Sequence, residues 1–391
     1  MKKTLLSLLL ASVATTAFSA TVYQSDNAKL TFGGEVRAHI NFYNPENKVD
    51  GTLSSERNGR YHQVRTRVWL AGEINDGQGL KFGFFVRGNH SWVYNYKKET
   101  TYTSGVKSVS ESRSHSRKGF ELNNANAYLS YNNFGEVRYG KFAVLSDRKF
   151  GDDTWVLSNK DKDYNHLGFT ASTAATSFDS SFQYTNKVGK VSFGASWGKT
   201  NTTSTTRLQQ TAALVAYNFT DSSKLQAIYY NTDTKTRGGV VGTTSALDTF
   251  DLAWYQSFDN GLEYGTAFTY EHSKNYVSSS STYNNGDAWS LAAKVSYTLN
   301  QYFAPYTGIS YVHASHKYAN KANTTKAHAV HFYLGASSTL VKYNSVNLVV
   351  FLEGSYVKGT KDVTTVSSGT TTKVQNDITA TAVATGLRVR F

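Results

Sequence analysis

The chain ends in the stretch Thr381-Ala-Val-Ala-Thr-Gly-Leu-Arg-Val-Arg-Phe391, in which apolar and polar positions alternate with a period of two. This period predicts a β-strand, because successive side chains of a strand point to opposite faces. One face would carry Leu387, Val389 and Phe391, and the other would carry Arg388 and Arg390. In a soluble sheet the arginine face would meet bulk water. In an outer-membrane barrel the apolar face would meet lipid and the arginine face would line a polar lumen.

The amino terminus has the features of a secretory leader. A basic start at Lys2 and Lys3 precedes a short apolar run, and small residues follow at Ala17, Ser19 and Ala20. This order predicts a signal peptide over residues 1–20, cleaved after Ser19 or after Ala20. The apolar run is too short for the alternative, an anchoring helix, which needs roughly 20 apolar residues.

The composition of the remaining chain excludes a helical membrane protein. Mean hydropathy is −0.44, and no later apolar run approaches the length of a spanning helix. A secreted or periplasmic protein remains possible, as does a membrane β-barrel, whose alternating strands keep the mean hydropathy low. The chain has no cysteine, so its fold depends on its own hydrogen bonds, which a closed sheet satisfies internally. Long strands with aromatic belts also fit a chain with 2 Pro, 27 Tyr and 22 Phe.

The chain is basic, with a formal net charge of +13, or +11 once Lys2 and Lys3 leave with the leader. A charge of this sign suggests anionic partners. For an exported protein these would be lipopolysaccharide, acidic lipid or anionic solutes, and not nucleic acid. An ordinary solvated basic surface is the alternative explanation.

Sixteen alternating segments follow the leader, and each is predicted to be a strand. They are expected at about 29–43, 61–74, 80–94, 119–131, 135–142, 177–186, 190–200, 208–219, 223–233, 246–258, 261–275, 286–299, 302–317, 327–340, 345–358 and 377–391. Tight turns are expected from the turn-forming residues at 75–79, 132–135, 220–223, 259–261 and 300–301. Long polar loops are expected at 44–60, 95–118, 234–245, 276–285 and 359–376.

This arrangement of connections predicts an all-β, sixteen-stranded antiparallel transmembrane β-barrel, with short turns at one rim and long loops at the other. An even number of strands places both termini at the short-turn rim, which would be periplasmic. No linker or strict repeat divides the chain, so residues 21–391 are predicted to form one barrel domain. A soluble β-sandwich is the alternative, but it rarely needs so many hairpin-linked strands of this length.

Four segments resemble the general porins of Gram-negative outer membranes, and most closely the Pasteurella and Haemophilus type. They are the opening Thr21–Arg37, the segment Arg65-Thr-Arg-Val-Trp-Leu-Ala-Gly-Glu73, the segment Ala127–Lys141 and the ending Gly386–Phe391. Their order and spacing carry the resemblance, which covers nearly the whole mature chain. It implies a homotrimer of sixteen-stranded barrels in the outer membrane, through which small hydrophilic solutes and ions diffuse passively.

The same resemblance implies that the third external loop, about Ala143 to Leu167, folds inward and narrows the pore. Acidic residues of such a loop face a basic wall, and the candidates here are Asp147, Asp152 and Asp153, followed by Asp161 and Asp163. The loop also carries the basic residues Arg148, Lys149, Lys160 and Lys162. It has Lys149-Phe-Gly-Asp-Asp153 where enteric porins have Pro-Glu-Phe-Gly-Gly, so which acids face the pore is left open.

Strand parity assigns the basic wall without the resemblance. The apolar residues of each early strand share one face, and a charged side chain on that face would cost on the order of 2 to 4 kcal/mol at the bilayer midplane. The alternate face is therefore the lumen face, and its predicted basic residues are Arg37, Arg65, Arg67, Arg87 and Arg138. The acids on the same faces are Glu35, Glu73 and Glu136. Arg67 also matches a wall arginine that such porins carry on their second strand, whereas Asn123 and Asn124 stand where enteric porins have another.

Phe391 resembles the terminal aromatic residue that porins use as a signal for the outer-membrane assembly machinery. That machinery, outer-membrane lipid and lipopolysaccharide are therefore expected partners. Its position on the lipid face of the last strand would also place it in the periplasmic aromatic girdle.

No catalytic residue, cofactor or metal site is expected. His313 and His316, like His328 and His331, are three positions apart, so a strand would place each pair on opposite faces. A barrel protease or phospholipase is an alternative, but no segment clusters a nucleophile or a water-activating acid beside His. A substrate-specific sugar channel would need an aromatic track along the lumen, for which Trp69 and Phe85 alone are too few. An anchor or adhesin barrel would normally be narrower.

Overall fold

The chain forms a closed antiparallel β-barrel. The computed structural model describes residues 20–148, 178–201, 206–236, 245–277, 282–300, 302–318, 323–343, 345–367 and 370–391. No helix within these residues is long and apolar enough to cross a membrane.

Within these residues, the strands and two short 3-10 helices follow one another along the chain. They are β1 (Ala20–Gln24), β2 (Ala28–Val49), β3 (Thr52–Asn75), β4 (Leu80–Thr103), β5 (Val106–Tyr131), η2 (Asn132–Phe134), β6 (Glu136–Phe142), η3 (Leu145–Arg148), β7 (Phe178–Val188), β8 (Val191–Asn201), β9 (Thr206–Thr220), β10 (Ser223–Thr236), β11 (Ser245–Ser257), β12 (Leu262–Val277), β13 (Thr282–Tyr297), β14 (Ala304–Lys317), β15 (Thr324–Tyr343), β16 (Val346–Ser367) and β17 (Thr370–Arg390).

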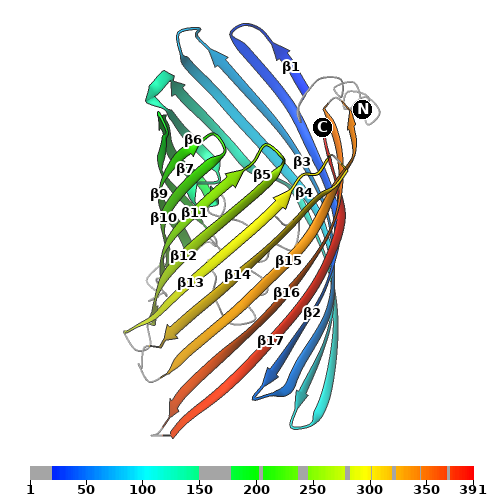
Figure 1. Ribbon diagram of the computed structural model, residues 1–391. Helices are drawn as coiled ribbons and strands as arrows, with labels where there is room; N and C mark the ends of the chain where they lie inside the picture. The colour runs from blue at the N-terminus through cyan, green and yellow to red at the C-terminus, as the bar shows by residue number, and fades with distance from the viewer. Residues whose placement is uncertain are drawn as a thin grey trace.

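Each strand from β2 to β17 pairs with its neighbours in sequence, and β17 pairs with β2 to close the barrel (Figure 1). The last residue takes part in this closure, because Gly34 and Phe391 exchange two backbone hydrogen bonds of 2.8 and 3.0 Å. Closure leaves no open edge along the seam, which a sheet in lipid requires. The prediction of a sixteen-stranded antiparallel barrel is confirmed.

The structure adds β1, a short strand that was not predicted from the sequence. Residues Ala20–Gln24 pair with the start of β2, from Lys29 to Phe32. The strand therefore lies at the rim that also holds the last residue of β17. Five residues are too few for alternation to stand out, which is why periodicity did not reveal it.

Three of the long loops predicted from the sequence are wrong, because the segments 44–60, 95–118 and 359–376 are mostly paired strand. The hairpin of β2 and β3 turns at Asp50 and Gly51, and that of β4 and β5 turns at Ser104 and Gly105. All four residues have positive φ, between 48° and 79°, which suits the tight hairpin turn that matches strand twist. Asp-Gly is a strong hairpin signal, and the polar composition around it concealed the pairing.

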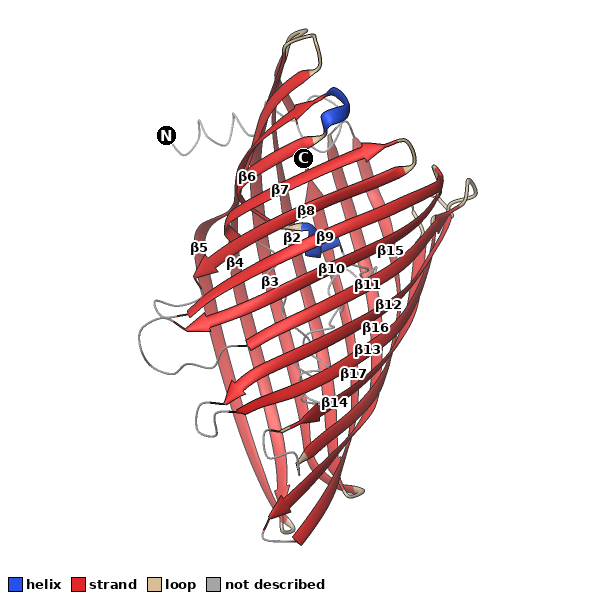
Figure 2. Cartoon of the chain, turned by 90° about the vertical axis from the view of Figure 1, so that its left-hand side faces the viewer, coloured by secondary structure: helices blue, strands red, loops and turns tan. Residues whose placement is uncertain are grey.

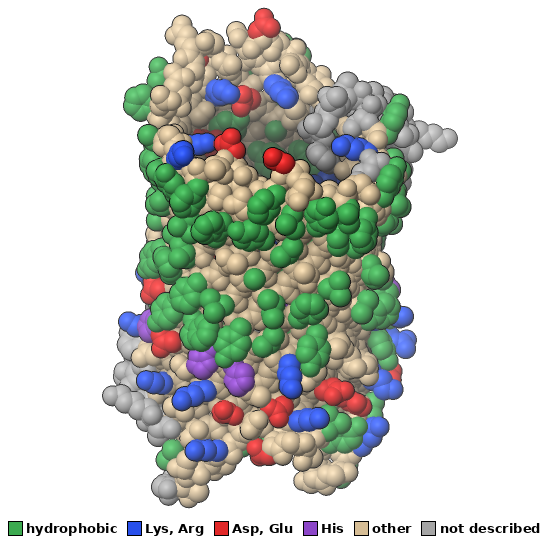
Figure 3. Space-filling model, in the orientation of Figure 1, with side chains coloured by type: hydrophobic (Ala, Val, Ile, Leu, Met, Phe, Trp, Pro, Cys, Tyr) green, Lys and Arg blue, Asp and Glu red, His purple; other side chains and the backbone are tan. Residues whose placement is uncertain are grey.

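The outer face of the barrel carries an apolar band between two polar rims (Figure 3). The apolar residues assigned to lipid are among the exposed ones, including Phe42, Val64, Leu70, Phe82, Val86, Val137, Val383 and Leu387. Burying this band in lipid supplies the hydrophobic term that a soluble protein obtains from its core. The alternation predicted for the early strands and for β17 therefore gives the correct outward faces.

A peptide tag inserted between Ser104 and Gly105 should be tolerated and should react with antibody on intact cells. The turn joins the paired residues Thr103 and Val106, and the entropic cost of closing the loop rises only slowly with its length.

A tag after Asp76 should be unreactive on intact cells, because that turn lies at the opposite rim. It should also disturb the turn, since the Asp76 carboxylate accepts hydrogen bonds from the N–H groups of Gln78 and Leu80. Labelling of an Asp76 tag on intact cells would show that the barrel has the opposite orientation in the membrane. Gly369, in the predicted loop 359–376, would be a second site for a tag, but it lies outside the described residues.

Candidate pore-lining site

Basic residues from four neighbouring strands meet on the inner face of the barrel. In one cross-strand row, Arg388 of β17 lies opposite Arg37 of β2, which lies opposite Arg65 of β3. In the next row, Arg390 lies opposite Glu35, which lies opposite Arg67. Direct cross-strand partners point to the same face, so these six side chains form one group.

Glu35 is the centre of this group. Its side chain is nearly inaccessible to solvent, at 3% exposure for the residue. One carboxylate oxygen, Oε2, accepts a hydrogen bond of 2.9 Å from Nε of Arg390. The other, Oε1, lies 3.7 Å from Arg65 and 3.8 Å from Arg67. One carboxylate thus partly neutralises a group of cations that would otherwise repel one another.

Arg87 extends the group onto β4. It interacts electrostatically with Arg65 and Arg67, and its Nε donates a hydrogen bond of 3.2 Å to Oδ1 of Asn123. We call Arg37, Arg65, Arg67, Arg87, Arg388 and Arg390 the arginine cluster. Asn123, which stands where enteric porins have an arginine, thus holds Arg87 of the cluster by a hydrogen bond.

Arg138, the fifth basic residue predicted for the wall, is not in the cluster. Its guanidinium forms an ion pair of 2.7 Å with Glu136 on the same strand and lies 5.1 Å from the centre of the Tyr128 ring. It also donates a hydrogen bond of 3.3 Å to Asn126. This pair is locally neutral and contributes little to the net charge of the wall.

Arg388 and Arg390 were not among the residues predicted for the basic wall. Alternation in the last strand had placed both on the lumen face, and that was the signal available in the sequence. Their meeting with Arg37 and Glu35 depends on the register of β17 against β2. Because that register joins the two ends of the chain, no local pattern specifies it.

The beginning of the loop after β6 packs against the inner wall. The short helix η3 lies against β9 and β10 (Figure 2). Its Leu145 is fully buried and lies in a cluster with Ala212, Leu214, Ala216, Ile228 and Tyr230 from these two strands. Its backbone N–H donates to the Ser196 hydroxyl at 3.2 Å. The sequence signal for this contact is the run Ala212-Ala-Leu-Val-Ala216, which is apolar on both strand faces although one face of a barrel strand meets water.

The loop acids predicted to face the wall are not placed by the structure. The side chain of Asp147 and the whole of Asp152 and Asp153 lie outside the described residues. Their assignment to a constriction stays a prediction.

The inner wall carries more aromatic residues than the two identified in the sequence. The rings of Tyr43, Tyr128, Tyr306 and Tyr333 each occupy the space beside a glycine, respectively Gly59, Gly83, Gly335 and Gly308 on a neighbouring strand. These rings fill the space beside residues that lack a side chain. Packing of the wall therefore accounts for them, and they are no evidence for an aromatic track that binds sugars. The Tyr306 hydroxyl also donates to the buried Glu353 at 2.7 Å.

The arrangement is suited to electrostatic attraction. Several guanidinium groups, which remain charged at all ordinary pH, surround the buried carboxylate of Glu35, and Arg37 also interacts with the buried carboxylate of Glu353. Within the described residues, no three His, Asp or Glu side chains are grouped as metal ligands would be. What the cluster can do chemically is raise the local concentration of anions.

Comparison with known proteins identifies similar sequences and folds. A sequence model of the Gram-negative porin family matches residues 7–383. A search of curated proteins returns no match. Among solved structures, in-vitro folded OmpT, an outer membrane protein of Vibrio cholerae, is 14% identical, with 95% of this chain and 99% of that chain covered and a TM-score of 0.61.

Two further structures have similar folds. An anion-selective porin from Comamonas acidovorans is 16% identical, with 93% of this chain and 100% of that chain covered and a TM-score of 0.56. The outer membrane channel DcaP of Acinetobacter baumannii is 13% identical, with 93% and 99% covered and a TM-score of 0.52. At these identities the likeness concerns the fold alone.

Proposed function

The chain belongs to the family of Gram-negative porins, outer-membrane channels for passive diffusion of small hydrophilic solutes and ions, and we propose that its arginine cluster gives this channel a weak anion preference. The observation that carries the proposal is the grouping of six arginines on one inner wall, five of them in the two cross-strand rows at Glu35 and the sixth, Arg87, beside Arg65 and Arg67. Fixed charges on the wall of a narrow aqueous pore act within the Debye length of about 10 Å at 0.1 M salt, so they bias which ion enters.

The inward loop is the second part of the proposal. We place the constriction between the arginine cluster and the acids of the loop from about Ala143 to Leu167. The burial of Leu145 against the inner faces of β9 and β10 supports an inward course for the loop's first residues. The basic residues of the loop nearly balance its acids, so the wall decides the sign of the preference.

We propose the following biological setting, which the family and the sequence support. Residues 1–20 act as a cleaved signal peptide, and residues 21–391 form the barrel. The mature chain assembles as a homotrimer, with the rim that holds its termini in the periplasm. Outer-membrane lipid, lipopolysaccharide and the outer-membrane assembly machinery are its partners, and Phe391 is the assembly signal. The chain has no catalytic activity of its own.

Reconstitution of the purified protein in a planar lipid bilayer tests this proposal. We expect conductance to rise in groups of three equal steps, as a homotrimer of open barrels would produce. In a salt gradient the zero-current potential should have the sign of a weak anion preference and should approach zero as salt screens the wall. Detergent without protein is the control. An absence of conductance would favour the enzyme or anchor alternatives, and a strong cation preference would contradict the role of the cluster.

A further inference from the structure

A row of inward-facing residues crosses β10 to β13 close to the rim that holds the chain termini. Lys224 of β10 lies opposite Tyr255 of β11, which lies opposite Gly265 of β12, and Gly265 lies opposite Lys294 of β13. Trp254, next to Tyr255, is an exposed apolar residue of the outer band, so Tyr255 points to the lumen. Direct cross-strand partners share a face, and the two lysines therefore point to the lumen as well.

Both lysines lie against the ring of Tyr255. Nζ of Lys224 is 4.4 Å from the centre of this ring, and Nζ of Lys294 is 5.9 Å from it. An aromatic ring attracts a cation within about 6 Å of its centre, so one ring holds two ammonium groups in the same part of the wall. Nζ of Lys224 also donates a hydrogen bond of 3.3 Å to Oε1 of Gln226, which fixes its position further.

Acidic residues lie nearer the rim than these lysines. The next inward row toward the rim contains Ser257, Glu263 and Ser296. The hydroxyl of Ser296 donates a hydrogen bond of 3.5 Å to Oε2 of Glu263. Glu263 is exposed, as is Asp221 in the turn before β10, whereas both lysines are half-buried. Positive charge is therefore separated from negative charge along the direction in which a solute passes.

The two rows line a pocket of about 310 Å³, together with the amide side chains of Asn218 and Gln256. Its volume lies at the lower end of the range for small-molecule pockets, roughly 300 to 1,000 Å³. Successive inward rows of a strand are about 7 Å apart, because each residue rises by about 3.4 Å. Two extended peptide residues span roughly the same distance. The separation of the lysine and glutamate rows thus matches the separation of the two terminal charges of a dipeptide.

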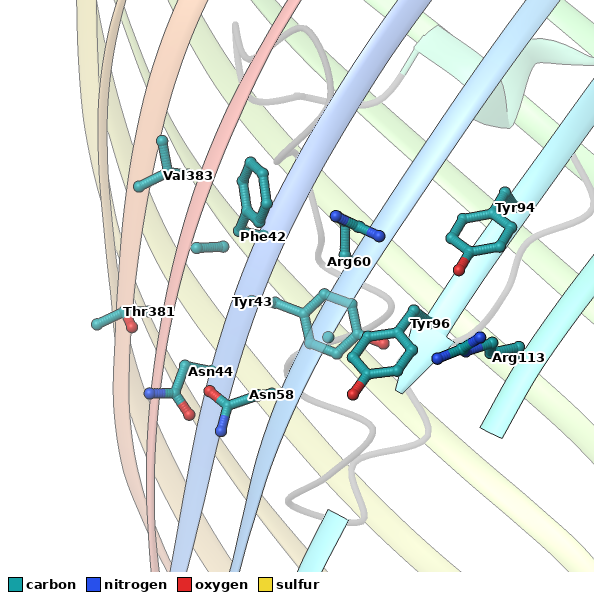
Figure 4. A pocket seen from close by; sticks show the side chains of 12 residues that line it. Phe42, Tyr43, Asn44, Asn58, Arg60, Tyr94, Tyr96, Arg113, Thr381 and Val383 are labelled. Carbon is teal, nitrogen blue, oxygen red and sulfur yellow. The ribbon is translucent and has the colours of Figure 1, made fainter. Parts of the chain in front are cut away.

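A larger groove, of about 620 Å³, lies along β17 and β2 to β5, and its lining includes Phe42, Arg60 and Val383 (Figure 4). Phe42 and Val383 are exposed apolar residues of the outer band. The strands β2 to β5 also lie on the opposite side of the ring of strands from β10 to β13. A solute that crosses the lumen does not meet lipid-facing residues, so of these two hollows it can reach the smaller one.

We propose that the pocket at β10 to β13 binds short zwitterionic peptides as they leave the channel. At neutral pH a free dipeptide carries a carboxylate at one end and an ammonium group at the other. The carboxylate lies against Lys224 and Lys294, and the ammonium group lies against the carboxylate of Glu263. The hydroxyls of Ser257 and Ser296 are available to the peptide amide. With the termini in the periplasm, as proposed above, the pocket lies at the periplasmic exit, and binding there does not depend on the sign of the ion preference.

The test uses the full folded protein in neutral detergent, with glycylglycine as the probe and ligand-observed nuclear magnetic resonance as the measurement. The double variant Lys224→Met with Lys294→Met should bind the dipeptide at least about fivefold more weakly, because two close charge contacts are lost. Lys81→Met is the matched control. Lys81 is a lysine near the same rim on the opposite wall, 3.4 Å from Glu73, so its loss should leave dipeptide binding unchanged.

Two probes that each keep one charge separate a zwitterion site from a general anion site. N-acetylglycine keeps the carboxylate, and glycinamide keeps the ammonium group. The native protein should bind each of them about fivefold more weakly than glycylglycine, since one charge contact is missing. Glu263→Gln should weaken the binding of glycylglycine and strengthen that of N-acetylglycine, because the same carboxylate attracts an ammonium group and repels an anion.

Three results would overturn the proposal. They are equal binding of glycylglycine by the native protein and the double methionine variant, equal binding of N-acetylglycine and glycylglycine by the native protein, and an equal loss of binding in Lys81→Met. The second would identify the pocket as a general attractor of anions. If the double variant does not fold, Glu263→Gln with the three probes decides the question, because this exposed side chain keeps its size. A native protein that binds the dipeptide without conducting would defeat the proposed channel function and would leave the pocket intact.

Discussion

Replacing Arg65 and Arg67 together by alanine should shift the zero-current potential of the channel toward cation preference. The two residues contribute two of the six positive charges in the cluster, and their loss leaves Glu35 with Arg390 as its close partner. Two unit charges a few ångströms apart interact by about 1 kcal/mol in water, so the ratio of anion to cation permeability should fall by about fivefold. The shift should be larger at low salt, where screening is weaker.

Two other variants make this measurement specific. Arg138→Ala also removes an inner arginine, but its ion pair with Glu136 lies outside the cluster, so we expect a smaller change. Glu35→Gln removes the central negative charge and should move the potential in the opposite direction, toward anions. If the double variant leaves the potential unchanged, Arg65 and Arg67 do not lie at the constriction.

Deletion of Phe391 should reduce the amount of folded protein in the outer membrane by at least about tenfold. The residue closes the barrel through two backbone hydrogen bonds with Gly34, each worth about 1 kcal/mol, and its ring covers the Gly34 backbone. Without it, the backbone N–H and C=O of Gly34 lose their partners and the last residue pair of the seam is left open. The terminal signal proposed for the assembly machinery would be lost as well. Surface biotinylation measures the amount of protein at the cell surface, and the difference in gel migration between heated and unheated samples measures how much of it is folded.

The matched control for the deletion is Phe391→Tyr. This change keeps an aromatic ring beside Gly34 and both backbone hydrogen bonds, so assembly should be close to that of the native chain. Export into the periplasm should be the same for all variants, because the leader is untouched. Native surface levels of the deleted chain would contradict both the structural role and the signal role of Phe391.

The strands could be predicted from the sequence wherever one face meets lipid. Alternation in β2, β3 and β17 is strict within the apolar band, because a shift by one residue would turn an arginine toward hydrocarbon. Beyond the band both faces meet water, and alternation no longer distinguishes strand from loop. That is why the outer parts of β4 and β5, which continue to the turn at Ser104 and Gly105, were not predicted. Their polar composition alone suggested a loop.

The site was predictable in part for the same reason. Parity placed the early arginines on the lumen face, but which of them meet depends on register between strands, and Arg138 proved to be paired elsewhere. The central role of Glu35 could not be predicted, because an isolated glutamate among arginines looks like an ordinary lumen residue. The loop contact at Leu145 could have been predicted from β9, because apolar residues occupy both faces of that strand.

The pairing of β2 with β17 must be a late step in the folding of this barrel. Glu35 and Arg390, joined there by a hydrogen bond, are 355 positions apart in the chain. Contacts of such long range form late and slowly, because the intervening chain must first be ordered. Until the last residues are in place, β2 and β17 are both unpaired sheet edges, which are templates for pairing with other chains. A chain whose seam is still open therefore exposes two strand edges that can pair with those of other copies of the chain, and pairing of β17 with β2 removes both edges at once.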